Sequence, residues 1–279
     1  MKTPLFAVAL TAFVSLGYTA AHAALATVDN FSSVTTDGTL LTTVSGWSGG
    51  TGANTASVST EFGYGDSKGA RIPSNGESYA LTLSGGNALT AADGPLEFKF
   101  NFRGSSGADA YQYTQIMIGQ TGGVNGLVVE FNGGTSNAST DNSIRVSSGT
   151  GVSWSNVGLG SSLANSAWVS GDWYEVTINF SLLTTGIGQN VTGTLSVYDQ
   201  TNSSYLIQNT SIAGTGTTGG AFNTANTVQL KNSGSARAFD VSDIRIGTAI
   251  PEPSSAAILA GASILGFAVL RRRSHQALR

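Results

Sequence analysis

The strongest constraint on the fold is hydropathy that alternates with a period of two. From Leu96 to Arg103, the apolar residues Leu96, Phe98, Phe100 and Phe102 alternate with the polar residues Glu97, Lys99, Asn101 and Arg103. Residues Trp173 to Leu182 alternate in the same way, with Tyr174, Val176, Ile178 and Phe180 on one face. Because a strand points successive side chains to opposite faces, both runs predict half-buried strands and exclude helices.

Many shorter runs of the same kind fill the chain between Leu25 and Gly247. Further strands are predicted at Tyr79–Leu83, Gln115–Ile118, Leu127–Phe131, Ile144–Val146, Thr194–Tyr198, Tyr205–Ile207, Thr227–Leu230 and Val241–Ile246. Turn clusters rich in Gly and Asn separate them, and no amphipathic helix precedes residue 254. A solenoid of parallel rungs would need a fixed repeat, which the sequence lacks. We therefore predict an all-β fold, a jelly-roll-like antiparallel β-sandwich, over residues 24–249.

The residue types missing from this middle segment exclude several kinds of chemistry. Residues 24–249 hold eight basic and 15 acidic residues, a formal net charge of −7, which disfavours nucleic acids and anionic membrane surfaces. The only histidines are His22 and His275, near the two ends, and there is no cysteine. The segment therefore cannot form a Ser-His-Asp triad, a cysteine nucleophile, the usual zinc sites, a haem site or an iron–sulfur cluster.

The N-terminus has the three parts of a secretory signal peptide. Lys2 supplies a positive charge, an apolar stretch runs from Leu5 to Leu16, and Ala21 and Ala23 are the small residues that signal peptidase requires. A membrane anchor or a buried helix is the alternative, but the apolar run is short for a span. We expect cleavage after Ala23, which makes residues 1–23 a signal peptide and places the rest of the chain outside the cytoplasm.

The C-terminus carries a second membrane signal. Residues 254–270 contain no charge and are just long enough for a transmembrane helix, while Arg271, Arg272 and Arg273 form a basic stop that stays in the cytoplasm. A buried amphipathic helix is disfavoured because the stretch has no polar face. Before it stand Pro251, Glu252 and Pro253, a stiff extended segment that suits a protease groove. The preceding domain is therefore expected to face outward.

Residues Ile250 to Arg273 resemble the PEP-CTERM sorting signal of exported proteins of Gram-negative bacteria. The resemblance implies that an exosortase processes the chain near Pro251, Glu252 and Pro253, and passes it from the inner membrane to the cell envelope or the extracellular polysaccharide matrix. A Gram-positive sortase signal would need Leu-Pro-x-Thr-Gly, and a GPI-type signal lacks a basic tail. Residues 250–279 are therefore interpreted as a sorting signal, with signal peptidase and exosortase as partners.

Two short motifs in the middle segment resemble the concanavalin A-like lectin/glucanase jelly rolls, laminin-G relatives included. They are Gly171-Asp172-Trp173-Tyr174-Glu175-Val176 and the closing run Phe239 to Ile246. The resemblance implies the fold, whereas activity must be argued from a site. The glucanase branch carries Glu-x-Asp-x-x-Glu, which is missing here.

Carboxylate pairs for glycoside hydrolysis are not evident. Asp172 with Glu175, and Asp240 with Asp243, have odd spacings that place them on opposite faces of a regular strand. A pair from distant strands, such as Glu97 with Glu130, stays open. We expect no catalytic residues and no enzyme activity, with a carbohydrate-active enzyme that uses an unrecognised carboxylate pair as the alternative.

Ligand sites are predicted from loops. Asp141 with Asn142, or Asp240 with Asp243, could contribute to a structural Ca²⁺ site, although such residues more often cap turns, and no other cofactor is expected. Trp154 and Trp168 are the candidates for stacking on sugar rings, followed by Tyr111 and Tyr113, whereas Trp173 begins a strand and suits the core or a sheet edge. The alternative for both candidates is a loop aromatic that covers one end of the sandwich. The predicted role is a non-catalytic envelope or matrix protein associated with exopolysaccharide or biofilm.

Overall fold

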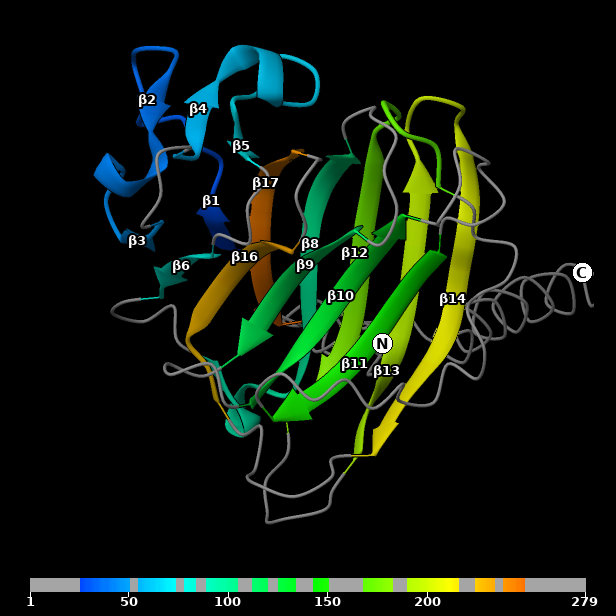
Figure 1. Cartoon of the computed structure of the whole chain (residues 1–279). Coiled ribbons are helices and arrows are strands. Elements are labelled where there is room, and N and C mark those ends of the chain that lie inside the picture. Colours follow the sequence, from blue (N-terminus) through cyan, green and yellow to red (C-terminus); the bar gives the residue numbers. More distant parts are fainter. Residues whose placement is uncertain are drawn as a thin grey trace, which may run out of the picture. The chain divides into compact units, whose positions relative to one another are not determined.

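The computed structural model describes residues 26–50, 55–73, 78–83, 89–104, 112–119, 125–133, 143–150, 168–182, 190–215, 224–233 and 238–248. Residues Ala24–Ala249 form one compact unit. Its described part is all-β, and two large antiparallel sheets lie one in front of the other (Figure 1). The predicted antiparallel β-sandwich is therefore confirmed.

The larger sheet has nine strands. Its order is β14 (Ser204–Thr215), β13 (Asn190–Asp199), β12 (Tyr174–Ser181), β8 (Pro95–Gly104), β17 (Phe239–Thr248), β5 (Gly69–Ile72), β4 (Ser57–Ser59) and β2 (Thr39–Leu40), with β1 (Ala26–Asp29) also paired to β17. Strand β17, late in the sequence, thus lies between β5 and β8. This placement brings residues more than 130 positions apart into adjacent strands.

The smaller sheet has six strands. Its order is β11 (Ser143–Thr150), β10 (Asn125–Gly133), β9 (Gln112–Gly119), β16 (Thr227–Ser233), β6 (Ser78–Thr82) and β3 (Trp47–Gly49). A separate pair joins β15 (Thr224–Ala225) to β7 (Leu89–Thr90), and the short 3₁₀ turns are η1 (Leu41–Thr43), η2 (Thr60–Phe62) and η4 (Ala91–Asp93). Turn η2 contains Phe62, whose ring packs against Arg71 of β5.

Every strand predicted from alternation overlaps an observed strand, in most cases with ends that extend a few residues further. The short strands before residue 73 and the β7–β15 pair were not predicted. They have two to four residues each, too few to display a period. Their pairing depends on partners that are remote in sequence, such as β17 for β5.

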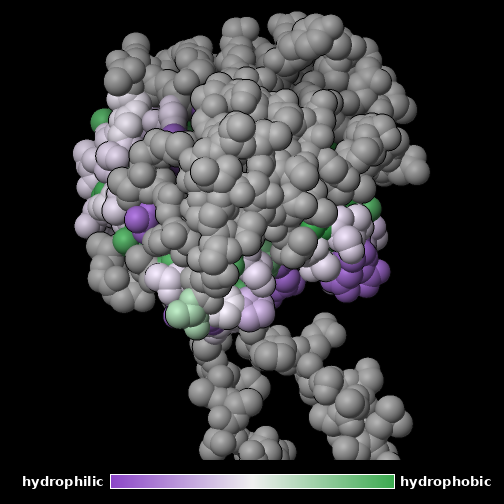
Figure 2. All heavy atoms as spheres, turned by 90° about the horizontal axis from the view of Figure 1, so that it is seen from below, coloured by the Kyte–Doolittle hydropathy of each residue, from purple (hydrophilic) through white to green (hydrophobic). Residues whose placement is uncertain are grey.

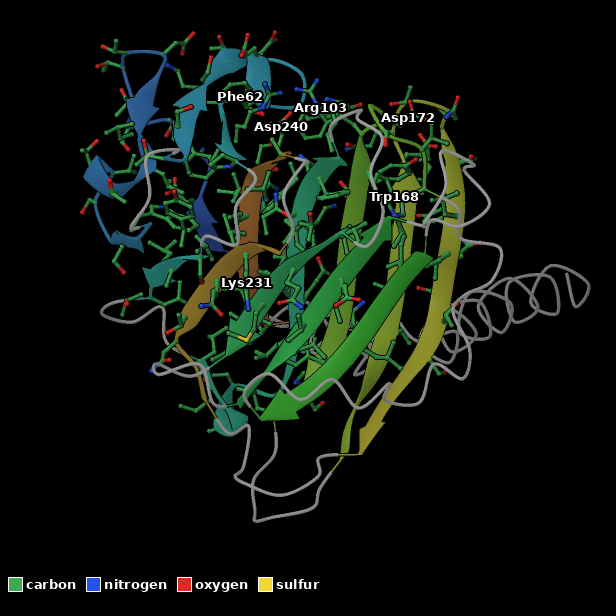
Figure 3. All side chains as sticks on the ribbon, in the orientation of Figure 1. Phe62, Arg103, Trp168, Asp172, Lys231 and Asp240 are labelled. Atoms are coloured by element: carbon green, nitrogen blue, oxygen red, sulfur yellow. The ribbon has the colours of Figure 1, made fainter. Side chains whose placement is uncertain are left out.

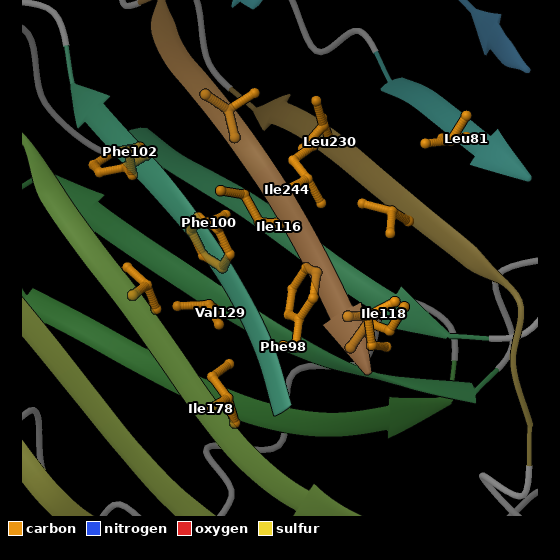
Figure 4. Close-up of a cluster of buried hydrophobic side chains, with 14 of the residues drawn as sticks. Leu81, Phe98, Phe100, Phe102, Ile116, Ile118, Val129, Ile178, Leu230 and Ile244 are labelled. Carbon is orange, nitrogen blue, oxygen red and sulfur yellow. The ribbon is translucent and has the colours of Figure 1, made fainter. Parts of the chain in front are cut away.

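The core lies between the two large sheets. The apolar face of β8 supplies Leu96, Phe98, Phe100 and Phe102, each with no exposed area. They pack with residues of the smaller sheet that include Ile116, Ile118, Val129 and Leu230 (Figure 4). At one end of this core the rings of Phe102 and Phe131 stack with their centroids 3.7 Å apart, which joins β8 to β10. The alternation of the sequence is therefore realised as one continuous buried layer.

Among the described residues, large apolar side chains are exposed only at scattered positions. They are Leu40, Tyr64, Val169 and Tyr205. Seen from below, the described surface is mostly pale or purple, with small separate green areas (Figure 2). In the described part of the chain, no helix has the length and apolar character needed to cross a membrane. The segment predicted to do so, residues 254–270, lies outside the described residues.

Candidate functional site

Three charged residues face one another across neighbouring strands of the larger sheet. Asp240 on β17 is directly opposite Arg71 on β5 and Arg103 on β8. Each alternates with core residues, such as Val241 beside Asp240, so all three side chains lie on the outer face of the sheet. Figure 3 shows Arg103 and Asp240 close together at the upper end of their strands, near Phe62.

The two guanidinium groups share one carboxylate. Arg71 donates from Nε to Oδ1 of Asp240 at 2.7 Å and from Nη2 to Oδ2 at 3.0 Å. Arg103 donates to the same Oδ2 from Nε at 2.8 Å and from Nη2 at 2.6 Å. Such charge-assisted, two-pronged contacts are among the strongest hydrogen bonds in proteins. The hydrogen bond to Asp240 raises the pKa of Arg71, so Arg71 stays charged.

Burial differs sharply between the members of this group. The side chain of Asp240 is 1% exposed, whereas those of Arg71 and Arg103 are 37% and 24% exposed. A buried carboxylate is tolerated because its four hydrogen bonds replace water. The carboxylate thus serves as a buried anchor for two arginine side chains that are partly exposed.

Aromatic rings support both guanidinium groups. The Cζ of Arg71 lies 4.0 Å from the ring centre of Phe62, and the Cζ of Arg103 lies 4.7 Å from that of Trp173. Tyr64 meets Trp173 edge to face at 5.8 Å and is 38% exposed. Arginines stacked in this way gain a cation–π attraction and lose freedom to move. We call Phe62, Tyr64, Arg71, Arg103, Trp173 and Asp240 the arginine–aromatic cluster.

The loop that carries Tyr64 is tied to the sheet by backbone contacts. Nη2 of Arg103 donates to the carbonyl oxygen of Glu61 at 2.8 Å, and the amide of Tyr64 donates to Oγ of Ser242 at 3.4 Å. A Cβ built on Gly63 would lie 1.9 Å from the carbonyl oxygen of Ser67, and one built on Gly69 would lie 1.9 Å from that of Phe62. Both positions therefore require glycine, and the loop places Tyr64 beside Trp173.

A second polar group lies where β12 begins and β13 ends. Nδ2 of Asn202 donates to Oδ2 of Asp172 at 3.0 Å and to Oδ2 of Asp199 at 2.9 Å. Burial raises the pKa of Asp172, and the charge of Asp199 raises this pKa further, while the Asn202 bond lowers it. The backbone amide of Asn202 also donates to Oδ1 of Asp199 at 2.8 Å. Asp199, which is buried, therefore caps the turn after β13.

The sugar-stacking prediction is wrong for Trp168 and stays untested for the other candidates. Trp168 is only 4% exposed and meets the rings of Phe102 and Phe131 edge to face at 5.9 Å and 6.3 Å. Its ring therefore closes the end of the core, as the alternative held, and is not the exposed plane that stacking needs. Trp173 is buried as expected. Trp154 and Tyr111 lie outside the described residues, and Tyr113 is described only as a member of β9.

The carboxylates considered for catalysis are separated. Glu97 is on the outer face of the larger sheet and Glu130 on the outer face of the smaller one, with the core between them. Glu130 accepts a hydrogen bond from Gln115 at 3.2 Å, and in the register of β16 Gln115 is opposite Lys231. Glu175 forms an ion pair with Lys99 at 2.8 Å. Glu97 and Glu130 therefore cannot act as a pair, whereas Asp172 has a neighbour, Asp199, that spacing did not suggest.

Asp240 and Asp243 do not share a ligand site either. A β-bulge between Ser242 and Arg245 breaks the regular alternation, and Asp243 has a φ of 52°. Asp243 pairs with Arg245 at 2.6 Å, while Asp240 pairs with Arg71 and Arg103. Among the described residues, no three His, Asp or Glu side chains are grouped closely enough to hold a metal ion.

The remaining predicted sites fall outside the described residues. They are the calcium candidates Asp141 and Asn142, the cleavage residues Ala21 and Ala23, the motif Pro251, Glu252 and Pro253, and the stop residues Arg271, Arg272 and Arg273. The arginine–aromatic cluster was not predicted, because its partners are up to 169 residues apart. One feature of the sequence could have indicated the site. Tyr64 lies between Gly63 and Gly65, and a tyrosine between two glycines has no adjacent apolar side chain with which to form a core.

Comparison with known proteins gives no family. No protein-family model matches the chain, and no curated protein matches it significantly. Among solved structures, a carbohydrate esterase of the Shiga toxin-encoding bacteriophage phi24B is similar at 14% identity, with a TM-score of 0.46 over 81% of this chain and 100% of that one.

Two further solved structures are similar at comparably low identity. The exoplasmic/lumenal domain of VIP36, in its form with bound Ca²⁺ and Man3GlcNAc, has 11% identity and a TM-score of 0.44 over 77% of this chain and 89% of that one. A lectin II of Ulex europaeus has 10% identity and a TM-score of 0.40 over 72% and 91%. Identity this low carries no information about function, which depends on the chain's own residues.

Proposed function

We propose that this chain is an exported, non-catalytic protein whose jelly-roll-like sandwich binds polysaccharide at the arginine–aromatic cluster. The observation that carries the proposal is the exposed ring of Tyr64, which is backed by Trp173 and lies beside the stacked Arg103. A pyranose ring presents a flat C–H face to an aromatic ring and hydroxyl groups to nearby donors. The rigid cluster offers both, with little entropy to lose on binding.

Replacing Tyr64 with Ala is expected to weaken binding to soluble polysaccharides about tenfold, the cost of losing one central aromatic contact. The measurement is affinity electrophoresis of the full-length protein through gels that contain a panel of neutral and acidic glycans. Tyr205→Ala is the matched control, because Tyr205 is 53% exposed and meets Tyr198 edge to face at 5.0 Å outside the cluster. Equal loss in both variants, or binding by neither variant nor the parent, would refute the proposal.

A carbohydrate-active enzyme is the second candidate, and Asp172 with Asp199 is the pair that favours it. Hydrolysis needs one protonated and one ionised carboxylate, and the raised pKa of Asp172 points in that direction. Against it, Asp199 is buried and both carboxylates are bound by Asn202. We expect no new reducing ends in the same glycan panel. Turnover that disappears in Asp172→Asn would instead establish the enzyme.

Export and sorting form the rest of the proposal and rest on the sequence of the two ends. Signal peptidase removes residues 1–23, and an exosortase cleaves near Pro251, Glu252 and Pro253 before the domain reaches the envelope or the polysaccharide matrix. Mass spectrometry of the mature protein is expected to find an N-terminus at Ala24 and a C-terminus close to residues 251–253. A mature chain that still ends at Arg279 would count against exosortase processing.

A further inference from the structure

The charges within the arginine–aromatic cluster do not balance. Two guanidinium groups face the single carboxylate of Asp240, and both donate to the same oxygen, Oδ2. Glu61 is a further acid whose negative charge helps to raise the pKa of Arg71. Glu61 is exposed, and among the described residues it forms no ion pair. One positive charge is thus left without a bound partner.

The hydrogen-bonding capacity of the arginines is also only partly used. Each arginine donates hydrogen bonds from Nε and Nη2 to Asp240, and Nη2 of Arg103 also donates to the carbonyl oxygen of Glu61. Within the described part of the chain, neither arginine donates a hydrogen bond from Nη1. Guanidinium N–H groups match the oxygens of a carboxylate or sulfate in spacing and direction. The cluster therefore presents guanidinium N–H donors that no described acceptor uses.

The support around the arginines favours a ligand site over a purely structural brace. A structural brace needs only the contacts to Asp240, whose side chain is 1% exposed, yet the side chains of Arg71 and Arg103 are 37% and 24% exposed. Phe62 and Trp173 fix their planes, and Tyr64 adds an exposed ring at the same place. Together they can hold an anionic group and a sugar ring at once.

We infer that the glycan bound by the cluster is acidic, and that its carboxylate or sulfate group accepts hydrogen bonds from Arg71 and Arg103 while a sugar ring lies against Tyr64. The inference rests on the proposed function and specifies its ligand. The domain as a whole carries a net charge of −7 and repels polyanions, so such binding must be local to the cluster.

The test compares matched glycans with and without charge. The full-length protein is titrated with polygalacturonate and with carboxyl-reduced polygalacturonate, and then with dextran sulfate and with dextran. We expect at least tenfold tighter binding to one or both acidic polymers than to their neutral counterparts, and weaker binding as salt is raised. Equal affinity for both members of each pair would overturn this inference and leave the proposed function intact, whereas binding to no glycan would overturn both.

Substitutions test whether the preference for acidic polymers arises at the arginine–aromatic cluster. Arg71→Gln is expected to reduce the preference for acidic polymers at least tenfold. Lys68→Gln, which removes a charge from the exposed Lys68–Asp37 pair, should leave it unchanged. If Arg71→Gln does not fold, Arg71→Lys keeps the charge and removes the planar fork, and it should lose the preference as well. An unchanged preference in the folded variant would overturn the assignment of Arg71.

Discussion

Replacing Asp240 with Asn lowers the free energy of unfolding by about 3 kcal/mol, the low end of the cost of breaking a buried ion pair. An amide is the same size as the carboxylate but points an N–H group at donors of Arg71 or Arg103. The two guanidinium groups then repel each other without a counter-charge. The effect stays at the low end because both arginines are partly exposed and can turn toward water. Urea unfolding of the two proteins measures the difference.

Asp243→Asn is the matched control for this substitution. Asp243 also pairs with an arginine, but its side chain is 23% exposed and that of Arg245 is 42% exposed. Surface pairs of this kind contribute no more than about 1 kcal/mol. Asn also tolerates the left-handed conformation at this position, where φ is 52°. If the two variants are equally stable, Asp240 is not the buried anchor of the cluster.

Replacing Phe102 with Ala lowers the free energy of unfolding by about 4 kcal/mol, the usual cost of removing a buried phenylalanine ring. Phe102 has no exposed area and stacks on Phe131 of the opposite sheet. Its ring also meets Trp168 edge to face, so the cavity removes support from the residue that closes the core. Chemical denaturation followed by tryptophan fluorescence reports both effects.

The control for Phe102 is the exposed Tyr205, whose replacement with Ala should change the stability by less than about 0.5 kcal/mol. Phe102→Leu keeps most of the buried volume, and its cost should fall between the two. A loss below about 1 kcal/mol in Phe102→Ala would mean that the two sheets do not pack through this ring.

The fold was largely predictable because its long strands show the same alternation of apolar and polar residues. Residues such as Phe98 and Val176 alternate with polar neighbours for long enough to fix both the strand and its buried face. The short strands β2 to β5 have no such length, and their partners are fixed by the sheet. The bulge at Asp243 was not predicted, although the spacing of three between the buried residues Val241 and Ile244 marks it in the sequence.

The candidate site was less predictable because it depends on distant pairings. Arg103 was identified as an outward residue of its strand, but nothing in one sequence joins it to Asp240, 137 residues later. Trp168 was placed among loop aromatics because it lies in a stretch rich in Gly, Ser and Asn, residues 149–172, yet Phe102 and Phe131 from two sheets enclose it. Its burial is a property of the packed sandwich.

The central claim is that glycans bind at the arginine–aromatic cluster on the larger sheet, and amide hydrogen exchange with and without a bound polysaccharide tests it most directly. The account predicts slower exchange at residues 60–64 and 171–174 when the glycan is added, with β9, β10 and β16 unchanged. Slower exchange confined to those three strands would place the glycan on the outer face of the smaller sheet and contradict the account.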